Sequence, residues 1–298
     1  MSYRVTIPCT RAQGEAVADA EDLFPGSVVP PVVVADEPDE TKPEEWVLHA
    51  YFDDEPTDDE LAELRRLGTG EPEVEHLEDT TDWVTKSQQG LQPIRAGRFF
   101  VHTPMHYADR PSDTVNFEID AGLAFGTGQH ATTAGCLEAL DRLEVSATHF
   151  SNIADIGTGT GLLAFAALAL WPDAKCIATD IDPIAVDVSR ENAAINSVKR
   201  GHGAGELLLA AADGMDSPML AARAPFDLLI ANILAGPLIE LAPAFARALE
   251  PGGTIVLAGL LDTQADAVAS AYEALGLKLQ DRGTGEWPVL VLKGPSQV

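Results

Sequence analysis

Residues Ile153 to Gly161, which read Ile-Ala-Asp-Ile-Gly-Thr-Gly-Thr-Gly, constrain the fold more than any other stretch of the chain. A short apolar strand runs directly into a glycine-rich turn. The turn opens an apolar helix over residues 162–171, which Pro172 ends. Gly157, Gly159 and Gly161 permit positive φ angles and let the backbone approach a ligand, and the helix start offers unpaired N–H groups. The stretch therefore predicts a nucleotide-binding turn.

Asp180 follows the next predicted strand, residues 175–179, where a carboxylate can meet the two hydroxyls of a ribose. The glycine spacing alone does not identify the cofactor, because Gly159, Gly161 and Ala164 also satisfy the dinucleotide pattern G-x-G-x-x-G/A. Both S-adenosylmethionine and a nicotinamide dinucleotide remain open on this stretch. The neighbouring segments must decide between them.

Strand and helix patterns alternate from Ile153 onward, which is typical of a doubly wound, mainly parallel α/β sheet. Asp182-Pro183 is an N-cap and N1 pair at the start of the second helix. Asp213 lies just beyond a strand at 207–210. It is a candidate contact for an adenine amino group, with a solvated loop acid as the equal alternative. The further strands are expected at 226–231 and 254–258.

Two final strands, residues 277–281 and 287–292, are joined by Arg282-Gly-Thr-Gly. This link is too short for a parallel crossover, so we expect an antiparallel C-terminal hairpin. A parallel sheet closed by such a hairpin is typical of the Rossmann-like sheet of S-adenosylmethionine methyltransferases. The pattern therefore favours a methyltransferase over a dehydrogenase.

The front of the chain has a different pattern. Its strands are expected at 2–10, 27–35, 46–52 and 73–77, and its helices at 11–23 and 57–67, so the order is βαββαβ, as in a small ferredoxin-like α+β domain. Residues 1–86 hold 23 acidic and 6 basic residues, a net −17 of the chain's −28. Such a field repels nucleic acid and attracts basic partners, although a merely soluble acidic surface is an equal alternative. Residues 87–112 are interpreted as a linker and lead-in, with a strand candidate at 98–102, and residues 113–298 as the second domain.

The composition indicates a cytoplasmic protein. No charged-then-apolar leader opens the chain, and no apolar run approaches eighteen residues, so no membrane partner is expected. The three cysteines, Cys9, Cys136 and Cys176, are far apart and odd in number, so we expect reduced thiols. Only His102 and His106 stand at a ligand-like spacing, and they fall beside prolines, so no metal site is expected.

Phe125-Gly-Thr-Gly-Gln-His-Ala-Thr-Thr133 is the second unusual segment, and a helix at 134–143 follows it. Thr132 or Thr133 could cap that helix, which is the structural alternative to a role in binding. His130 could likewise be a packed loop histidine. Thr127 between two glycines, followed by His130, favours a polar lid that folds over a charged small molecule.

Together with Asp155 to Gly161 and Asn232-Ile-Leu-Ala-Gly-Pro-Leu238, this segment makes residues 113–298 resemble the ribosomal protein L-11 methyltransferases. The resemblance implies S-adenosylmethionine as cofactor, with contacts at Thr133, Gly157, Asp180 and Asn232. It also implies methylation of lysine ε-amines and of the N-terminal α-amine of a ribosomal protein, with the front domain recognising that substrate. The sequence departs from the family at Ala131, where a proline is common, and at Thr158 and Thr160, where a cysteine or serine is common.

Methyl transfer suits these residues, because an in-line displacement needs a neutral, well-oriented amine more than acid or base assistance. Asn232 can accept the N–H groups of the amine, whereas a turn-forming asparagine is the structural alternative. A nicotinamide-dependent oxidoreductase and a non-enzymatic ribosome-associated module remain as competing hypotheses. We expect a monomer with no direct contact to nucleic acid.

Overall fold

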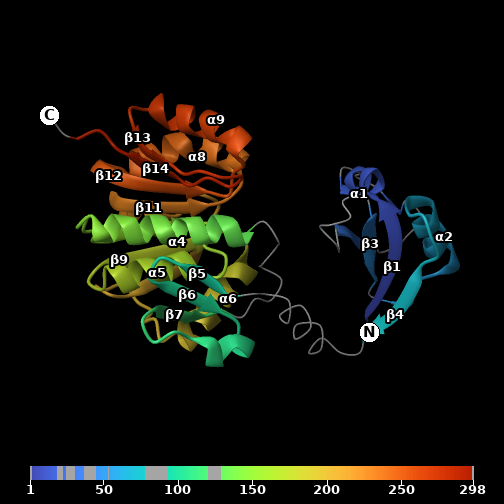
Figure 1. Ribbon diagram of the computed structural model, residues 1–298. Coiled ribbons are helices and arrows are strands. Elements are labelled where there is room, and N and C mark those ends of the chain that lie inside the picture. Colours follow the sequence, from blue (N-terminus) through green and yellow to red (C-terminus); the bar gives the residue numbers. More distant parts are fainter. Residues whose placement is uncertain are drawn as a thin grey trace. The chain divides into compact units, whose positions relative to one another are not determined.

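The computed structural model describes residues 2–18, 23–24, 31–36, 45–52, 54–77, 93–119 and 129–296. The chain divides into two compact units, Met1–Ser87 and Gln88–Val298, which are described separately (Figure 1). Among the described residues, no helix has both the length and the apolar character needed to cross a membrane.

The front unit is a four-stranded antiparallel sheet in the order β2-β3-β1-β4. Its helix α2 starts at a capping box, in which Thr57 and Glu60 exchange side-chain to backbone hydrogen bonds. The predicted second strand begins later than expected, and the first helix, predicted to reach Leu23, is described only to Ala18. The elements are β1 (Ser2–Thr10), α1 (Arg11–Ala18), β2 (Val32–Asp36), β3 (Glu45–Phe52), α2 (Asp58–Leu67) and β4 (Glu73–Leu77).

A seven-stranded sheet in the order β10-β9-β8-β11-β12-β14-β13 forms the second unit. The first five strands in this order are parallel, and β14 pairs antiparallel with both β12 and β13. The strands are β8 (Asn152–Ile156), β9 (Lys175–Asp180), β10 (Leu207–Ala211), β11 (Phe226–Asn232), β12 (Leu249–Ala258), β13 (Lys278–Arg282) and β14 (Leu290–Lys293). The sheet is a Rossmann-like α/β sheet.

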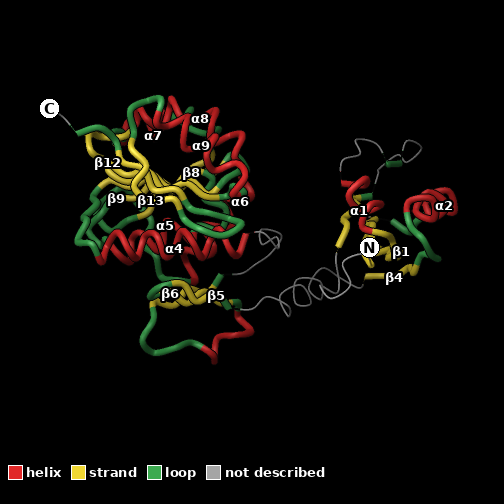
Figure 2. The backbone as a smooth tube through the Cα atoms, turned by 45° about the horizontal axis from the view of Figure 1, so that its top comes forward, coloured by secondary structure: helices red, strands yellow, loops and turns green. Residues whose placement is uncertain are grey.

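Helices cover both faces of this sheet, as Figure 2 shows. One apolar cluster joins the sheet to α4 (Gln129–Val145), α5 (Leu162–Leu170) and α6 (Pro183–Ile195). The other joins it to α7 (Pro218–Arg223), α8 (Ala235–Ala248) and α9 (Asp262–Glu273). The central strands β8, β9, β11 and β12 are largely buried on both faces, which explains why they read as apolar runs, whereas the edge strand β13 is mostly exposed.

Residues 93–112 were expected to be a linker with one strand candidate at 98–102; the structure has that strand as β6, but the segment around it is not a linker. Three short strands, β5 (Ile94–Ala96), β6 (Phe99–His102) and β7 (Val115–Glu118), form a separate small sheet, and the 3₁₀ helix η1 (Pro104–Asp109) connects β6 to β7. Phe99 and Phe117 from this sheet are buried in the same core as α4 and α5. Arg98 also pairs with Asp141 and Glu144 of α4, each at 2.5 Å. The segment is therefore an integral part of the second unit.

Candidate functional site

The candidate site lies at the carboxyl edge of the seven-stranded sheet. The chain builds outward from β8 to β9 and β10, then crosses back to place β11 on the other side of β8. In such sheets, ligands bind outside the carboxyl ends of the strands where the order reverses. Gly157, Asp180 and Asn232 stand at the ends of β8, β9 and β11, so three of the predicted site residues lie at this edge.

The three glycines of the turn differ in what a side chain at each position would contact. All three have positive φ angles, of 74°, 55° and 86° at Gly157, Gly159 and Gly161. A Cβ on Gly161 would lie 2.5 Å from the ring of Phe165, so this glycine permits close packing of the turn against its own helix. A Cβ on Gly159 would meet no described atom within 4 Å. Gly159 therefore presents bare backbone to open space, as a ligand cradle does.

Helix α6 holds the turn in place from the side. The Ser189 hydroxyl donates to the carbonyl of Gly159 at 2.7 Å, and the Asn192 amide donates to the carbonyl of Thr160 at 3.1 Å. Ser189 and Asn192 are buried and three residues apart, so they share a face of the helix. Sequence reasoning missed both residues, although two small polar residues at this spacing on a buried helix face were an available signal.

Asp180 connects β9 to the glycine turn. Its Oδ2 accepts the backbone N–H of Gly159 at 2.9 Å, and its Oδ1 accepts the N–H of Asp182 at 3.1 Å. A carboxylate oxygen has lone pairs for more than one donor, so both oxygens can still accept a hydroxyl. Asp180 is thus fixed beside the open face of Gly159, as the ribose prediction requires.

Asp213 is less well supported by the geometry. The N–H of Ala212 donates to the carbonyl of Asp180 at 2.8 Å, which brings the loop after β10 next to the end of β9. Asp213 itself is exposed, and the contact that involves it is a backbone one, from the N–H of Asp216 to its carbonyl at 2.9 Å. Its carboxylate stays a proposed adenine contact.

Asn232 and Thr133 meet across 99 residues of sequence: the Asn232 Nδ2 donates to the Thr133 Oγ1 at 3.5 Å. Thr133 is buried inside α4, which begins at Gln129 rather than at residue 134. The alternative in which Thr132 or Thr133 caps this helix is therefore wrong, because both lie within it. The hydroxyl of Thr133 is directed at the end of β11 instead.

The turn that carries Asn232 is enclosed by two glycines. A Cβ on Gly157 would lie 2.3 Å from the Ile233 side chain, and a Cβ on Gly259 would lie 2.4 Å from the Ile233 carbonyl oxygen. The N–H of Ile233 also donates to the carbonyl of Ala258 at 3.1 Å. Close approach on both sides therefore fixes the backbone on which Asn232 sits.

The two residues proposed for the lid are less completely described. Thr127 lies outside the described residues. The backbone of His130 belongs to the first turn of α4, and its side chain lies outside the description. Their lid role stays a prediction.

Asp155 is a buried carboxyl beneath the glycine turn that sequence reasoning did not select as a site residue. It is 1% exposed, and the Thr158 hydroxyl donates to its Oδ2 at 2.6 Å. Burial raises the pKa of Asp155 to about 7, hydrogen bonds from Thr158 and from the Ala164 backbone oppose this shift, and the charge of Asp180 adds to it. The sequence motif could not reveal the raised pKa of Asp155, because the shift depends on how the surrounding residues pack.

A pH dependence of stability follows for Asp155. The pKa of Asp155 is about 7 in the folded chain, against about 3.9 in the unfolded chain, so the folded state holds the proton more tightly. This preference stabilises the fold fully below about pH 4 and is lost as the pH rises through 7. The free energy of unfolding of Asp155→Asn should therefore rise relative to wild type between pH 4 and 7, by at most about 1.4 kcal/mol per pH unit. Urea unfolding across this range checks it, with the exposed carboxyl variant Asp173→Asn as control. Parallel profiles for wild type and Asp155→Asn would contradict the shift.

Comparison with known proteins agrees with this geometry. The family profile described as ribosomal protein L11 methyltransferase (PrmA) matches residues 4–294. A ribosomal protein L11 methyltransferase from Caulobacter sp. strain K31 is 42% identical over 292 residues, covering 96% of this chain and 95% of that protein. One from Brucella suis is 51% identical over 216 residues, covering 72% of each.

A solved structure supports the same assignment. The ribosomal protein L11 methylase from Lactobacillus delbrueckii subsp. bulgaricus superposes with a TM-score of 0.58 at 26% identity, covering 69% of this chain and all of that one. The family match also disfavours the two competing hypotheses, a nicotinamide-dependent oxidoreductase and a non-enzymatic ribosome-associated module. The chain belongs to the ribosomal protein L11 methyltransferase family, whose members are S-adenosylmethionine-dependent enzymes.

Proposed function

We propose that this chain transfers methyl groups from S-adenosylmethionine to lysine ε-amines and the N-terminal α-amine of ribosomal protein L11. The observation that carries the proposal is the pairing of Asn232 with Thr133 at the same sheet edge as the Gly159 cradle and Asp180. An amine-orienting group and an adenosine-binding group thus stand at the ends of β11 and β9, the two strands that flank β8. The names of the relatives supply the protein substrate.

The residues at this edge fit the cofactor. Asp180 offers acceptors for ribose hydroxyls, and the open face of Gly159 leaves room that a side chain would fill. Gly157, Thr133 and Asn232 complete the proposed contacts, Gly161 supports the turn, and Asp213 is the proposed adenine contact. S-adenosylmethionine, when bound, supplies a methyl group activated on a sulfonium.

Asn232 would orient the acceptor amine. Its Nδ2 is directed to Thr133, so its Oδ1 keeps its lone pairs for an amine N–H. A lysine with a pKa near 10.4 must be neutral to react, and deprotonation at pH 7 costs about 4 to 5 kcal/mol. The Asn232 carbonyl would accept an N–H of the neutral amine and aim the amine lone pair at the methyl group. Thr127 and His130 would close over the site and exclude water.

The front unit would recognise the protein substrate. We class it as ferredoxin-like, since its βαββαβ order and its strand order β2-β3-β1-β4 support that class. The net charge of −17 over residues 1–86 suits the capture of a lysine-bearing protein and serves no purpose in binding adenosine. We place the enzyme in the cytoplasm as a monomer.

A chain that begins at Gln88 tests this division of labour. It keeps both sheets of the second unit, so it should bind S-adenosylmethionine with the affinity of the full chain. Its kcat/KM for ribosomal protein L11 should fall by about tenfold or more, because charge steering is lost. Calorimetry and a radiolabelled methyl-transfer assay give the two readouts.

Salt dependence provides the internal control for that experiment. Exposed charges are screened over about 8 to 10 Å at ordinary ionic strength, so kcat/KM of the full chain should fall as salt rises while cofactor affinity changes less. The shortened chain should have lost most of this dependence. If it methylates L11 at the full-length rate, the front unit is not the recognition domain.

A further inference from the structure

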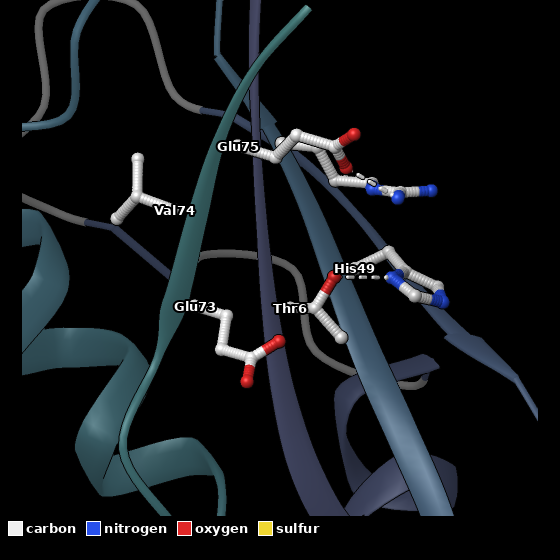
Figure 3. A pocket seen from close by; sticks show the side chains of 6 residues that line it. Thr6, His49, Glu73, Val74 and Glu75 are labelled. Carbon is white, nitrogen blue, oxygen red and sulfur yellow. Dashed lines mark hydrogen bonds and ion pairs between the residues drawn. The ribbon is translucent and has the colours of Figure 1, made fainter.

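In the front unit, the described helices α1 and α2 pack against one face of the sheet, and neither covers the other face. Val5, Ile7 and Leu48 point to the side on which α1 and α2 pack, and all three are fully buried. Successive residues of a strand alternate between faces. Arg4 and Thr6 of β1 and His49 of β3 therefore point to the opposite face, and Figure 3 shows His49 and Thr6 side by side there.

The strand register orders this face into two rows that cross all four strands. Each row starts at a valine on the edge strand β2, passes a ring on β3 and a polar residue on β1, and ends at a glutamate on β4. The rows are Val34, His49, Thr6, Glu73 and Val32, Tyr51, Arg4, Glu75. One side of the face is apolar at its two valines, with Asp36 of β2 beyond them, and the other side is acidic.

The two glutamates differ in their partners. Arg4 Nη2 lies 2.5 Å from Glu75 Oε2, so this carboxylate is paired. The Glu73 carboxylate has no hydrogen bond or ion pair to any residue that the structure describes. It borders a groove of about 590 Å³ lined by Arg4, Thr6, His49, Glu73, Val74 and Glu75. The groove thus offers one uncompensated negative charge.

His49 does not compensate that charge. Its Nδ1 is 3.0 Å from the Thr6 hydroxyl. Burial lowers the pKa of His49, the charge of Arg4 lowers it further, and Asp36 opposes the shift. The groove accordingly keeps its negative charge at neutral pH.

The apolar side of the face is unusually open. Val32 and Val34 are 66% and 47% exposed, on a strand that forms the edge of the described sheet. Exposed apolar residues that adjoin a polar rim mark interaction surfaces more often than isolated ones do. Val32, Val34 and Glu73 together would fit a partner that presents apolar side chains beside a positively charged group.

We infer that this helix-free face is the surface on which the front unit docks its protein substrate, with a substrate lysine against Glu73 and substrate apolar side chains against Val32 and Val34. The inference rests on the proposed function. Charge complementarity decides among occupants, because a second copy of this chain would bring a net charge of −28 against an acidic face, and nucleic acid would bring phosphates.

The test compares charge reversal on this face with the same reversal on the opposite layer, in the full-length enzyme. Glu73→Lys and Val34→Asp should each raise the KM for ribosomal protein L11 by about tenfold, with kcat and S-adenosylmethionine affinity unchanged. The matched control is Asp59→Lys, at an exposed position on α2. It changes the net charge equally and should alter KM by about twofold or less.

The measured KM values and the oligomeric state distinguish the possible occupants of this face. Wild-type KM in Glu73→Lys and Val34→Asp, with L11 methylated normally by the wild type, overturns the docking face and leaves the proposed function standing. Failure of the wild type to methylate L11 overturns the proposed function itself. A wild-type dimer that Val34→Asp converts to a monomer in sedimentation assigns the face to a second copy and overturns the inference. Glu73→Gln, which keeps the side-chain shape, should raise KM about two- to fivefold and guards against misfolding of the reversal variant.

Discussion

Replacing Asn232 by alanine is expected to lower the single-turnover rate of methyl transfer by about 10²- to 10³-fold. The variant loses the proposed acceptor for the amine, and orientation is a contribution made mainly in the transition state. The loss in kcat should therefore exceed the loss in affinity for either substrate. Rapid-quench measurement with saturating L11 and S-adenosylmethionine gives the rate directly.

Two further variants separate orientation from general damage. Thr133→Val removes the hydroxyl that receives the Asn232 amide while leaving Asn232 in place, so it should cause a smaller loss, of about tenfold. Asn116→Ala removes an asparagine of β7 whose side-chain amide donates to the carbonyls of Pro111 and Thr114 just before that strand, and the activity of this variant should be normal. An undiminished rate in Asn232→Ala would reduce this residue to a former of the turn.

Replacing Asp180 by alanine is expected to weaken S-adenosylhomocysteine binding by roughly ten- to more than hundredfold. A charge-assisted hydrogen bond to the ribose contributes about 1.5 to 3 kcal/mol, which corresponds to that range. The structure adds a second cause, because the N–H of Gly159 loses its acceptor and the glycine turn loses a fixed point. Calorimetric titration checks the affinity, and a thermal melt checks that the variant folds.

Asp182→Ala is the matched control, since it removes the same charge two residues away. Asp182 caps α6 by accepting the N–H of Ile184 at 2.8 Å. Its loss should cost about 1 kcal/mol of stability and leave cofactor affinity intact. Equal affinity losses in the two variants would mean that Asp180 acts only through its charge, without a specific contact.

The elements of the site that depend on local sequence were predictable. A strand, a glycine-rich turn and an acidic residue after the next strand fall at fixed spacings, and the structure places Gly157 and Asp180 at neighbouring strand ends. Asp182-Pro183 as a helix start was predictable for the same reason and is confirmed. Each of these features is set by residues within one turn or one strand of each other.

The features that depend on tertiary contacts were not predictable. The start of α4 was placed five residues late, because Thr132 and Thr133 resemble caps, and their burial against the sheet could not be read from the sequence. The strand candidate at 98–102 corresponds to β6, but β5 is only three residues long, and the parallel pairing of β6 with β7 requires knowledge of the core behind them. The six-residue helix α7 was missed because one and a half turns carry little periodicity.

The order of the last three strands of the seven-stranded sheet, β12-β14-β13, has a consequence for chains that are still being synthesised. Strand β14 lies between β12 and β13, although it follows both in the sequence. A nascent chain that has not reached Leu290 already carries every residue of the proposed cofactor site, but β12 has an unpaired edge and β13 has no neighbour within the sheet. Unpaired strand edges on incomplete chains promote aggregation and invite proteolysis. A chain that ends before the last strand is therefore expected to aggregate or to be degraded even though the residues of the proposed site are all present.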